Sequence, residues 1–351
     1  RVAPTTQPIR LSLGAQLCRL LVATALGCGA GTSAFGQGAS AVIAVYHHVS
    51  TQTPASTSLS PAQFTRHLDL LQEQDQAVIA LPSLLDALQH DAQIPDRAVA
   101  ITFDDGYESI FTTAFPLLQQ AGMDFTVFVS TGPIDRAQRG YMNWDQLRML
   151  VEAGVTIGNH GTEHASLLEM SADEIRSEVL AAQRRIDEEL GVQPRLFAYP
   201  YGEYSLEAKA VLKELGYLGL AQNSGAVGSS SDFQAIPRFP LAGIYADSEG
   251  ASQKFLTLAF DLRALGDVDP VTTSPAPSVT LQLRTRDFEG IGCFDQGAAL
   301  ELQRQDSARI TLLPEARERG RRWHYICTAR RSDSERYYWY SQPWFDPSQP
   351  Q

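Results

Sequence analysis

The sequence predicts an α/β fold followed by a small all-β domain, and three observations support this prediction. After residue 40, apolar runs of strand length alternate with amphipathic segments of helix length, which is typical of parallel strands covered by helices. This alternation stops near Gly266, where a stretch rich in proline, serine and threonine begins. Beyond that stretch, short runs of alternating apolar and polar residues indicate antiparallel strands with one buried face.

The first region contains a series of predicted strands separated by helices. The strands are AVIAVY (41–46), AVAITF (98–103), FTVFVS (125–130), VTIG (155–158), LFAY (196–199) and LGLAQ (218–222). Ser60 with Gln63, and Ser171 with Glu174, predict helix starts of the capping-box type. The second of these helices should end at Gly191. The spacing fits a barrel or an open sheet, and in both the functional residues belong at the carboxyl ends of strands.

The second region contains predicted strands without a helix between them. They are SVTLQLRTRDF (278–288), ARITLL (308–313), RWHYICTAR (322–330) and RYYWYSQPWF (336–345). Cys293 and Cys327 lie here, and in an exported protein such a pair favours a disulfide over a metal site. Three tryptophans fit either a packed core or a surface that stacks on sugar rings. The predicted domains are residues 37–265 and 279–351, joined by a linker at 266–278.

Composition and charge narrow the possible functions. The 351 residues include 28 basic and 40 acidic ones, for a net charge of −12. This charge argues against a nucleic-acid-binding protein, because such proteins carry a basic face. The segment after residue 277 contains 11 arginines and 10 acidic residues, so the acidic excess belongs to the first region. An acidic first domain suits a neutral substrate.

The first 36 residues are predicted to form an export signal. Arg1, Arg10 and Arg19 precede the apolar run LLVATALGCGA, and cleavage is expected after Gly36. Because the apolar run is too short to span a bilayer, no membrane span is expected after signal removal. A lipid anchor through Cys28 is the alternative. The expected location is the periplasm or cell envelope, or outside the cell after secretion.

Two motifs at predicted strand ends carry candidate metal ligands. In AVAITFDDGYES, Asp104 and Asp105 follow a buried strand, where adjacent carboxylates need a cation or hydrogen bonds. The alternative is an ordinary Asp-Gly turn. In VTIGNHGTEHASL, His160 and His164 are four residues apart, and on a helical turn this spacing places both on one face, as one metal ion requires. The position of Glu163 differs from His-Glu-x-x-His, which excludes a zinc protease of that type.

Three motifs follow predicted strands in the order TFDDGY, NHGTEH and FAYPYGEY. With them, most of the first region resembles the polysaccharide deacetylase family (NodB homology, carbohydrate esterase family 4). The resemblance implies a distorted (β/α) barrel of seven strands that hydrolyses N-acetyl groups of an amino-sugar polymer. By position, Asp104 resembles the general base of the family, and Asp105, His160 and His164 resemble its metal ligands. The backbone N–H of Tyr201 resembles its oxyanion donor.

Two departures from the family pattern call for substitutes. The third motif usually begins with an arginine that orients the base, but Ala198 stands there. Arg238 in AIPRFPL is the candidate replacement, because a charge at an apolar strand end needs a partner. A late histidine that acts as general acid is missing, and His47 in AVYHHVS resembles the substitute found in the branch that acts on poly-N-acetylglucosamine. His48 should point to the opposite face, and the alternative is that both histidines only end the strand.

The predicted function is metal-dependent removal of N-acetyl groups from an N-acetylglucosamine polysaccharide, with poly-β-1,6-N-acetylglucosamine as the expected polymer. A peptidoglycan or chitin-oligomer deacetylase is one alternative, and a wall- or matrix-binding protein with weak catalysis is another. The expected metal is zinc, although two histidines and one aspartate also accept cobalt, nickel or iron. The expected partner is the polysaccharide rather than a nucleic acid.

Overall fold

The computed structural model of the protein describes residues 39–193 and 195–351, so the predicted export signal lies outside the described residues. The main sheet is built from strands that match the predicted ones and from a few shorter pieces. They are β1 (Ser40–Tyr46), β4 (Ala77–Val78), β5 (Ala98–Phe103), β6 (Phe125–Val129), β7 (Thr156–Asn159), β8 (Leu196–Ala198), β9 (Leu218–Leu220), β10 (Val227–Gly228) and β11 (Phe239–Pro240). Two further short strands, β2 (His48–Val49) and β3 (Ser58–Leu59), pair with each other.

The strands of the main sheet are parallel, with one exception. Their order is β10-β1-β5-β6-β7-β8-β9, while β4 joins β5 and β11 joins β1. Only β10 is antiparallel to its neighbour among these described strands. Strands β1, β5 and β6 are buried along almost their whole length, as expected for parallel strands covered on both faces.

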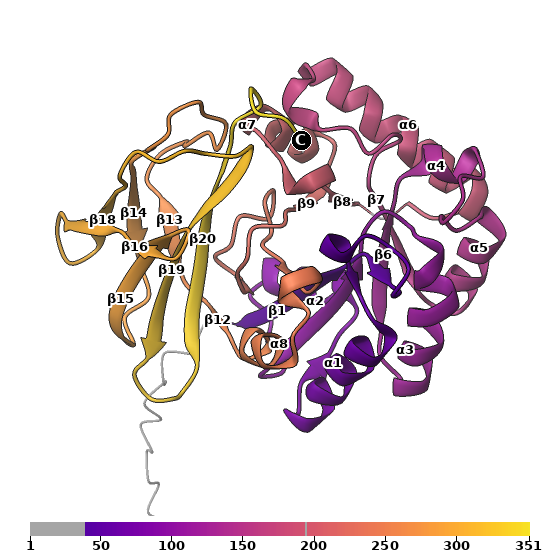
Figure 1. Ribbon diagram of the computed structural model, residues 1–351, viewed down its shortest axis with the longest axis horizontal. Coiled ribbons are helices and arrows are strands. Elements are labelled where there is room, and N and C mark those ends of the chain that lie inside the picture. Colours follow the sequence, from indigo (N-terminus) through magenta and orange to yellow (C-terminus); the bar gives the residue numbers. More distant parts are fainter. Residues whose placement is uncertain (1–38, 194) are drawn as a thin grey trace, which may run out of the picture. The chain divides into compact units, whose positions relative to one another are not determined.

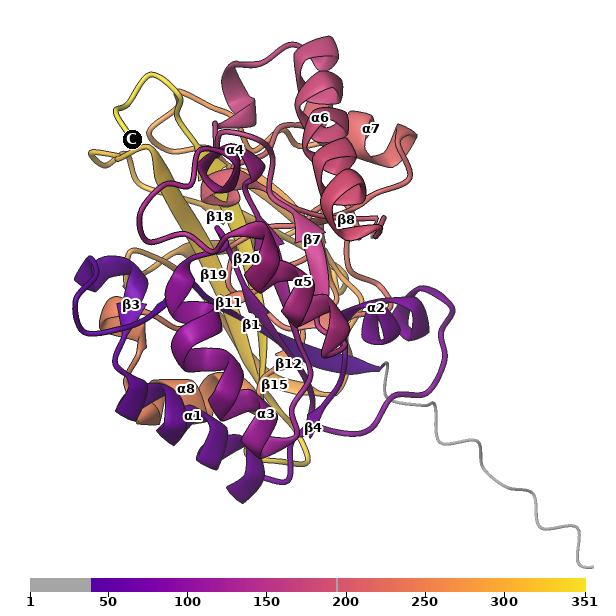
Figure 2. The ribbon, with the colours of Figure 1, turned by 90° about the vertical axis from the view of Figure 1, so that its right-hand side faces the viewer.

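Helices cover the outer face of this sheet (Figures 1 and 2). They are α1 (Pro61–Glu73), α2 (Leu81–Gln89), α3 (Phe115–Ala121), α4 (Thr131–Asp135), α5 (Trp144–Glu152), α6 (Ala172–Leu190), α7 (Leu206–Glu214) and α8 (Ser248–Phe255). The capping boxes of Ser60 with Gln63 and of Ser171 with Glu174 are both present. Helix α6 ends at Gly191, whose φ of 67° suits glycine at this position. These helix boundaries are as the sequence predicts.

Residues 236–240 connect the two ends of the parallel sheet. At one end Ile236 forms a parallel bridge with Leu220 of β9. At the other end β11 pairs in parallel with β1, where Phe239 lies opposite Ala44. The sheet is therefore curled, and this short segment completes it as a seventh strand. The predicted α/β fold with a distorted barrel is confirmed.

The C-terminal region forms two further sheets. Its strands are β12 (Leu258–Ala259), β13 (Leu262–Ala264), β14 (Val279–Leu283), β15 (Phe288–Asp295), β16 (Ala298–Ala299), β17 (Glu301–Arg304), β18 (Arg309–Leu313), β19 (Arg322–Arg331) and β20 (Tyr337–Phe345). One sheet has the order β12-β20-β19-β15-β16 and the other has the order β13-β14-β18-β17. We call the two sheets together the β-sandwich, because their inner faces share one apolar core.

The residues around the predicted boundary between the barrel and the β-sandwich are hydrogen-bonded to the β-sandwich. Strands β12 and β13 precede the predicted boundary at residue 265, yet they pair with β20 and β14, which follow it. The predicted linker at 266–278 is bonded to β20, because Phe345 bonds Pro270 and Thr272 through its backbone. The predicted division into domains stays a prediction. In the described residues, strands on the two sides of the predicted boundary pair with each other.

A disulfide and two tryptophans lie in the core of the β-sandwich. Cys293 and Cys327 are bonded and lie directly opposite each other in β15 and β19. Trp323 and Trp344 are buried in the same core, so they are core residues rather than a sugar-binding surface. Trp339 instead packs against barrel residue Phe239. Among the described residues, no helix is both long enough and apolar enough to cross a membrane.

Candidate active site

The acidic pair lies where β5 ends. The backbone N–H of Asp104 bonds the carbonyl of Tyr46, which is the last residue of β1. Asp105 has a φ of 74° and Gly106 a φ of 86°, so the chain turns sharply at this point. A Cβ at position 106 would come within 3.2 Å of Val129, which leaves little room for any residue except glycine. This turn places both carboxyl groups, which are buried, at the carboxyl end of the barrel.

Asp104 forms a bidentate ion pair with Arg238. Nη1 and Nη2 of the arginine each lie 2.7 Å from a different carboxylate oxygen, and both side chains are fully buried. Arg238 is held in turn by the carbonyl of Ala221 and the hydroxyl of Thr102. Burial raises the pKa of the Asp104 carboxyl, but the charges of Arg238 and His160 outweigh burial and hold that pKa below its ordinary value. Asp104 is therefore ionised and fixed in orientation.

Asp105, His160 and His164 converge on one point. Nε2 of each histidine lies 3.2 Å from Oδ1 of Asp105. Nδ1 of His160 lies 2.7 Å from the carbonyl of Ala198, so it carries the hydrogen and leaves the lone pair of Nε2 free for a metal. In the described part of the chain, Oδ1 of Asp105 and Nε2 of His160 are buried and make no hydrogen bond. Such buried atoms need a partner, so the residues present fit a metal ion.

The ionisable groups of Asp105, His160 and His164 shift one another's pKa values. Burial raises the pKa of Asp105, but the neighbouring His160, His47 and His164 outweigh burial and leave the pKa well below its ordinary value. Burial and the charge of His160 together lower the pKa of His164 to about 4. Neutral His164 and ionised Asp105 are the forms that bind a divalent cation.

The helical turn expected between the two histidines is wrong. Residues 160–164 form an irregular loop, in which Gly161 has a φ of 78° and His164 a φ of 53°. Glu178 of α6 accepts a hydrogen bond from the backbone of Thr162 in this loop. The imidazoles therefore meet because two left-handed residues bend the loop, and the i, i+4 rule does not apply. Glu163 pairs with Arg136 at the surface.

His47 and His48 have different surroundings, as predicted for successive residues of a strand. A charge on His47 lowers the pKa of both Asp104 and Asp105. Nδ1 of His47 is buried without a hydrogen-bond partner in the described residues. The ring of His48 instead stacks on Tyr107, with centroids 3.6 Å apart, and burial lowers its pKa to about 4. The role of His47 as general acid stays a prediction.

Tyr201 lies in a tight turn (Pro200–Gly202) that follows β8. Its φ of 60° is uncommon for a residue with a side chain. A Cβ at Gly202 would come within 2.6 Å of the Cβ of Gln222, so the close packing of this turn requires glycine. The ring of Tyr201 lies 4.4 Å from the ring of His164. The turn therefore lies beside the metal-ligand cluster, and the role of its N–H group stays a prediction.

Sequence reasoning missed two further groups. Nε2 of Gln222 donates a hydrogen bond of 3.3 Å to Oδ2 of Asp104. Its position at the end of the predicted strand LGLAQ could have indicated this role, because polar residues at strand ends belong to the site. The second group is Glu203 with Arg321 and Arg322 of the C-terminal region. These arginines carry no local signal, since only the fold brings them near the barrel.

An ionised base with a fixed orientation, next to three converging metal-ligand atoms, can activate a water molecule for attack on a carbonyl group. Its location at the carboxyl ends of parallel strands is where such barrels carry catalysis. Fold and site thus define a class, which is the barrel hydrolases with a candidate metal centre.

Comparisons with known proteins make the class specific. Residues 91–220 match the family model described as polysaccharide deacetylase. The poly-beta-1,6-N-acetyl-D-glucosamine N-deacetylase of Escherichia coli K12 is 28% identical over 225 residues, which cover 52% of this chain and 33% of that protein. The protein of the same name from Staphylococcus aureus MRSA252 is 24% identical over 209 residues, which cover 55% of this chain and 71% of that protein.

A solved structure shows the same relationship. IcaB from Ammonifex degensii superposes with a TM-score of 0.55 at 25% identity, covering 62% of this chain and 98% of that one. Residues 91–220 are therefore similar to a polysaccharide deacetylase domain, the type of domain that the motifs predict, and the structural match to IcaB supports the same fold. The β-sandwich lies beyond the matched residues 91–220.

Proposed function

We propose that this protein hydrolyses N-acetyl groups of an N-acetylglucosamine polymer, and that the polymer is of the poly-β-1,6-N-acetylglucosamine type. The observation that carries the proposal is the buried Asp104–Arg238 pair next to the Asp105, His160 and His164 cluster. The names of the E. coli and S. aureus relatives support the choice of polymer. The predicted export signal is compatible with a polymer outside the cytoplasm, and export is part of the proposal.

Asp104 is the proposed general base. An ionised carboxylate offers about four lone-pair positions. Arg238 takes one position on each oxygen and Gln222 takes a second one on Oδ2, which leaves one position on Oδ1. That remaining position accepts the proton of the attacking water. Because the arginine is fixed at both ends, the base needs no reorientation during the reaction.

Asp105, His160 and His164 are the proposed metal ligands. A bound divalent cation supplies Lewis acidity to the amide carbonyl and to the attacking water. Two nitrogen ligands and one carboxylate oxygen suit zinc and leave room for water and substrate, and cobalt, nickel and iron also accept this set. The hydrogen bond from His160 to the carbonyl of Ala198 keeps its free nitrogen turned toward Asp105.

Tyr201 and His47 are the proposed partners of the reacting amide. The N–H group of Tyr201 donates to the oxygen that becomes negative when water attacks, and the fixed turn holds this donor in place. His47, in its protonated form, gives a proton to the leaving nitrogen, so that acetate and a free amine result. The effect of its charge on the pKa values of Asp104 and Asp105, and its buried Nδ1 without a hydrogen-bond partner among the described residues, support this assignment.

The proposal is tested by acetate release from a partly acetylated β-1,6-linked glucosamine polymer. The protein is treated with a chelator and assayed with and without added zinc. We expect acetate release that depends on zinc and falls about 10²–10⁴-fold in Asp104→Asn, because the general base is removed. Asp145→Asn is the matched control, since Asp145 is an exposed carboxylate on α5. Equal activity of Asp104→Asn and wild type would contradict the proposal.

The choice of substrate is tested with the same variants. Activity on peptidoglycan or chitin oligomers, without activity on the β-1,6 polymer, would transfer the proposal to those substrates. Zinc binding without acetate release from any of the polymers would favour a binding protein.

His47 and His48 are adjacent, so replacing each in turn tests which of them is the general acid. We expect His47→Ala to lower kcat about 10²–10⁴-fold, whereas His48→Ala should have a smaller effect, because His48 stacks on Tyr107. The measurement is kcat on the same polymer with zinc at saturation. A loss of activity in His48→Ala but not in His47→Ala would show that the assignment is reversed.

A further inference from the structure

A cluster of charges around one buried carboxylate joins the β-sandwich to the barrel, and we call Ser166, Glu203, Arg321 and Arg322 the Glu203 cluster; Arg321 is buried, whereas 35% of the Arg322 side chain is exposed. The Glu203 carboxylate is fully buried. Nε of Arg321 and Nη1 of Arg322 each lie 2.8 Å from its Oε1. The hydroxyl of Ser166 and Nη2 of Arg321 bond its Oε2. Two arginines of the β-sandwich region therefore hold a carboxylate of the barrel.

The Glu203 cluster is attached to both turns of the candidate active site. Glu203 follows Tyr201 by two residues, and Ser166 follows His164 by two residues. The guanidinium of Arg322 also lies over the ring of Tyr201, at 5.4 Å from its centroid. One cluster thus holds the turn with the proposed oxyanion donor and the loop with a proposed metal ligand.

Both of these turns have a strained backbone. Tyr201 has a φ of 60° and His164 a φ of 53°, and side-chain-bearing residues seldom adopt such values. Strained conformations of this kind persist only where surrounding contacts fix them. Without the Glu203 cluster, each turn would lose a contact that lies two residues away from its strained position.

The arginines themselves have rigid supports. Arg322 is the first residue of β19, which is bonded to β15 and carries one end of the disulfide. Arg321 also bonds the carbonyls of Pro347 and Gln349, and only 4% of its side chain is exposed. A contact that served only adhesion would need no buried charge, since apolar residues of similar size hold surfaces together at least as well. Directional ion pairs are instead useful where the position of a group such as the Glu203 carboxylate must be fixed.

We propose that Arg321 and Arg322 are positioning residues of the enzyme, so that the β-sandwich region completes the active site of the barrel. This inference rests on the proposed deacetylase function. The arginines act through Glu203 and Ser166 on the turns of Tyr201 and His164. The β-sandwich then has a catalytic purpose that does not depend on binding polymer.

The experiment uses the full chain and three variants: Arg321→Gln, Arg322→Ala and Arg322→Lys. Arg319→Gln is the matched control. Arg319 also forms a buried bidentate ion pair, in which Nη1 and Nη2 each lie 2.8 Å from a carboxylate oxygen of Asp295. Only 4% of the Arg319 side chain is exposed. Its bonded partners, Asp295 and Pro275, belong to the C-terminal region rather than to the barrel. This control therefore loses a similar pair without a direct effect on either turn.

Three quantities are measured for each variant. They are kcat and KM for acetate release, the affinity for zinc, and the amide hydrogen exchange of residues 162–168 and 199–205. In Arg321→Gln and Arg322→Ala we expect kcat to fall about 10–100-fold with little change in KM, because the donor is displaced while the polymer-binding surface stays. Zinc affinity should fall about 10-fold, and exchange should accelerate in both turns. Arg322→Lys, which keeps the charge, should recover part of each loss.

The outcomes separate this inference from the proposed function. An equal loss of kcat in Arg319→Gln, at an equal loss of thermal stability, would overturn the inference, because general weakening of the β-sandwich would then be the cause. Unchanged exchange of both turns in Arg321→Gln and Arg322→Ala would also overturn it. If wild type releases no acetate from any polymer, the proposed function fails, while the exchange data still show whether the arginines hold the turns.

Discussion

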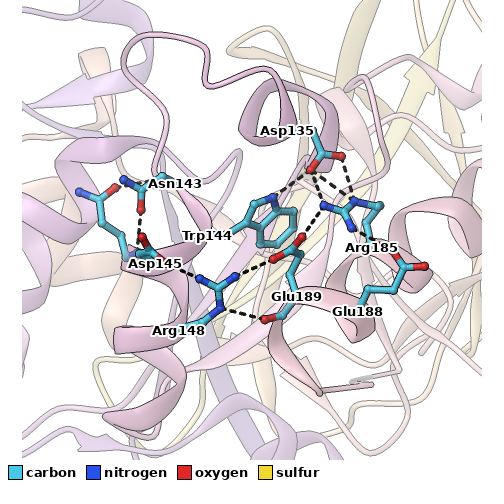
Figure 3. Close-up of polar contacts among 9 residues, drawn as sticks. Asp135, Asn143, Trp144, Asp145, Arg148, Arg185, Glu188 and Glu189 are labelled. Carbon is cyan, nitrogen blue, oxygen red and sulfur yellow. Dashed lines mark hydrogen bonds and ion pairs between the residues drawn. The ribbon is translucent and has the colours of Figure 1, made fainter.

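The ion pair of Arg238 with Asp104 and the ion pairs on helices α4, α5 and α6 use the same chemical groups in different surroundings. The first pair is fully buried at the carboxyl end of the barrel. The second set lies on the outer helices, where Arg185 bonds Asp135, and Arg148 bonds Glu189 (Figure 3). Its side chains stay partly exposed, with Arg185 at 33% and Asp135 at 35%.

The contrast shows what each set can contribute. Exposed ion pairs stabilise a protein by about 0–1 kcal/mol, because water screens the charges and long side chains lose freedom. Buried pairs lose so much hydration that apolar residues of the same size often stabilise the fold equally well. Stability therefore does not explain the presence of Arg238. The proposed role of Asp104 as general base, which needs an ionised carboxylate with a fixed direction, does explain it.

Removing one partner of the buried pair should have the largest effect on stability. In Arg238→Ala the carboxylate of Asp104 would be buried without its main partner, so we expect the free energy of unfolding to fall by about 3–5 kcal/mol. Acetate release should be lost as well. Urea unfolding followed by circular dichroism measures the first effect. A loss below about 1 kcal/mol, in the range of an exposed pair, would show that burial does not set this ion pair apart from the exposed ones.

The Glu203 cluster should give an intermediate effect that depends on pH. Burial raises the pKa of Glu203, but the hydrogen bonds from Arg321, Ser166 and Arg322 outweigh burial and leave it below its ordinary value. A lowered pKa adds stability above the pKa of the unfolded chain, and this stability is lost as the pH falls through the folded value. We therefore expect Glu203→Gln to lower the free energy of unfolding by about 1–3 kcal/mol at pH ~7.

The same reasoning sets the pH dependence of that difference. As the pH falls below the ordinary glutamate pKa and through the lowered pKa of folded Glu203, the wild-type carboxyl becomes protonated and resembles the variant, so the difference between the two proteins should shrink. Urea unfolding of both proteins across the acid range provides the measurement. A difference that stays constant as the pH falls would show that the charge of Glu203 is not its cause.

Replacing both partners of the buried pair should restore stability but not activity. With Asp104→Leu and Arg238→Met combined, no unpaired charge remains, so we expect the free energy of unfolding to return to within about 1 kcal/mol of wild type. Acetate release should remain absent, because the base is gone. The comparison with Arg238→Ala alone, measured in the same urea series, decides whether the unpaired charge causes the large loss. Equal losses in both variants would argue against it.

The smallest effect is expected on the outer helices. Arg185→Ala removes bonds to Asp135, Glu188 and Glu189, yet we expect a loss of less than about 1 kcal/mol. The loss should be smaller still at about 1 M salt, where the screening length is about 3 Å. Acetate release should equal that of wild type. A loss as large as that of Arg238→Ala would remove the distinction between the two sets of pairs.

The same contrast explains which parts of the molecule the sequence could predict. Asp104, Asp105, His160 and His164 each follow an apolar strand, so the rule for parallel sheets brings them to one edge without further information. The bend of the loop that carries His164 was not predictable, because it depends on left-handed residues and on the contact with Glu178. A spacing of four residues suggested a helical turn that is absent.

The residues that reach the site from distant parts of the sequence also differ in whether the sequence could predict them. Arg238 was a candidate because a charge in an apolar strand end needs a partner, and the structure pairs it with Asp104. Arg322 begins β19 and Arg321 precedes it, in a region where arginines are common, so nothing nearby in the sequence separates them from surface residues. Only the packing of that region on the barrel brings them to Glu203.

The segment 236–240 has a consequence for how the enzyme is made. A chain that ends before residue 236 already contains His47, the carboxylates after β5 and both histidine ligands. It lacks the strand that joins the edges of the sheet and the arginine that accompanies the base. With the proposed roles of Arg238, Arg321 and Arg322, catalytic competence arrives late in synthesis, after both the barrel and the C-terminal region are complete, and a shortened chain would lack activity even where its candidate metal ligands are present.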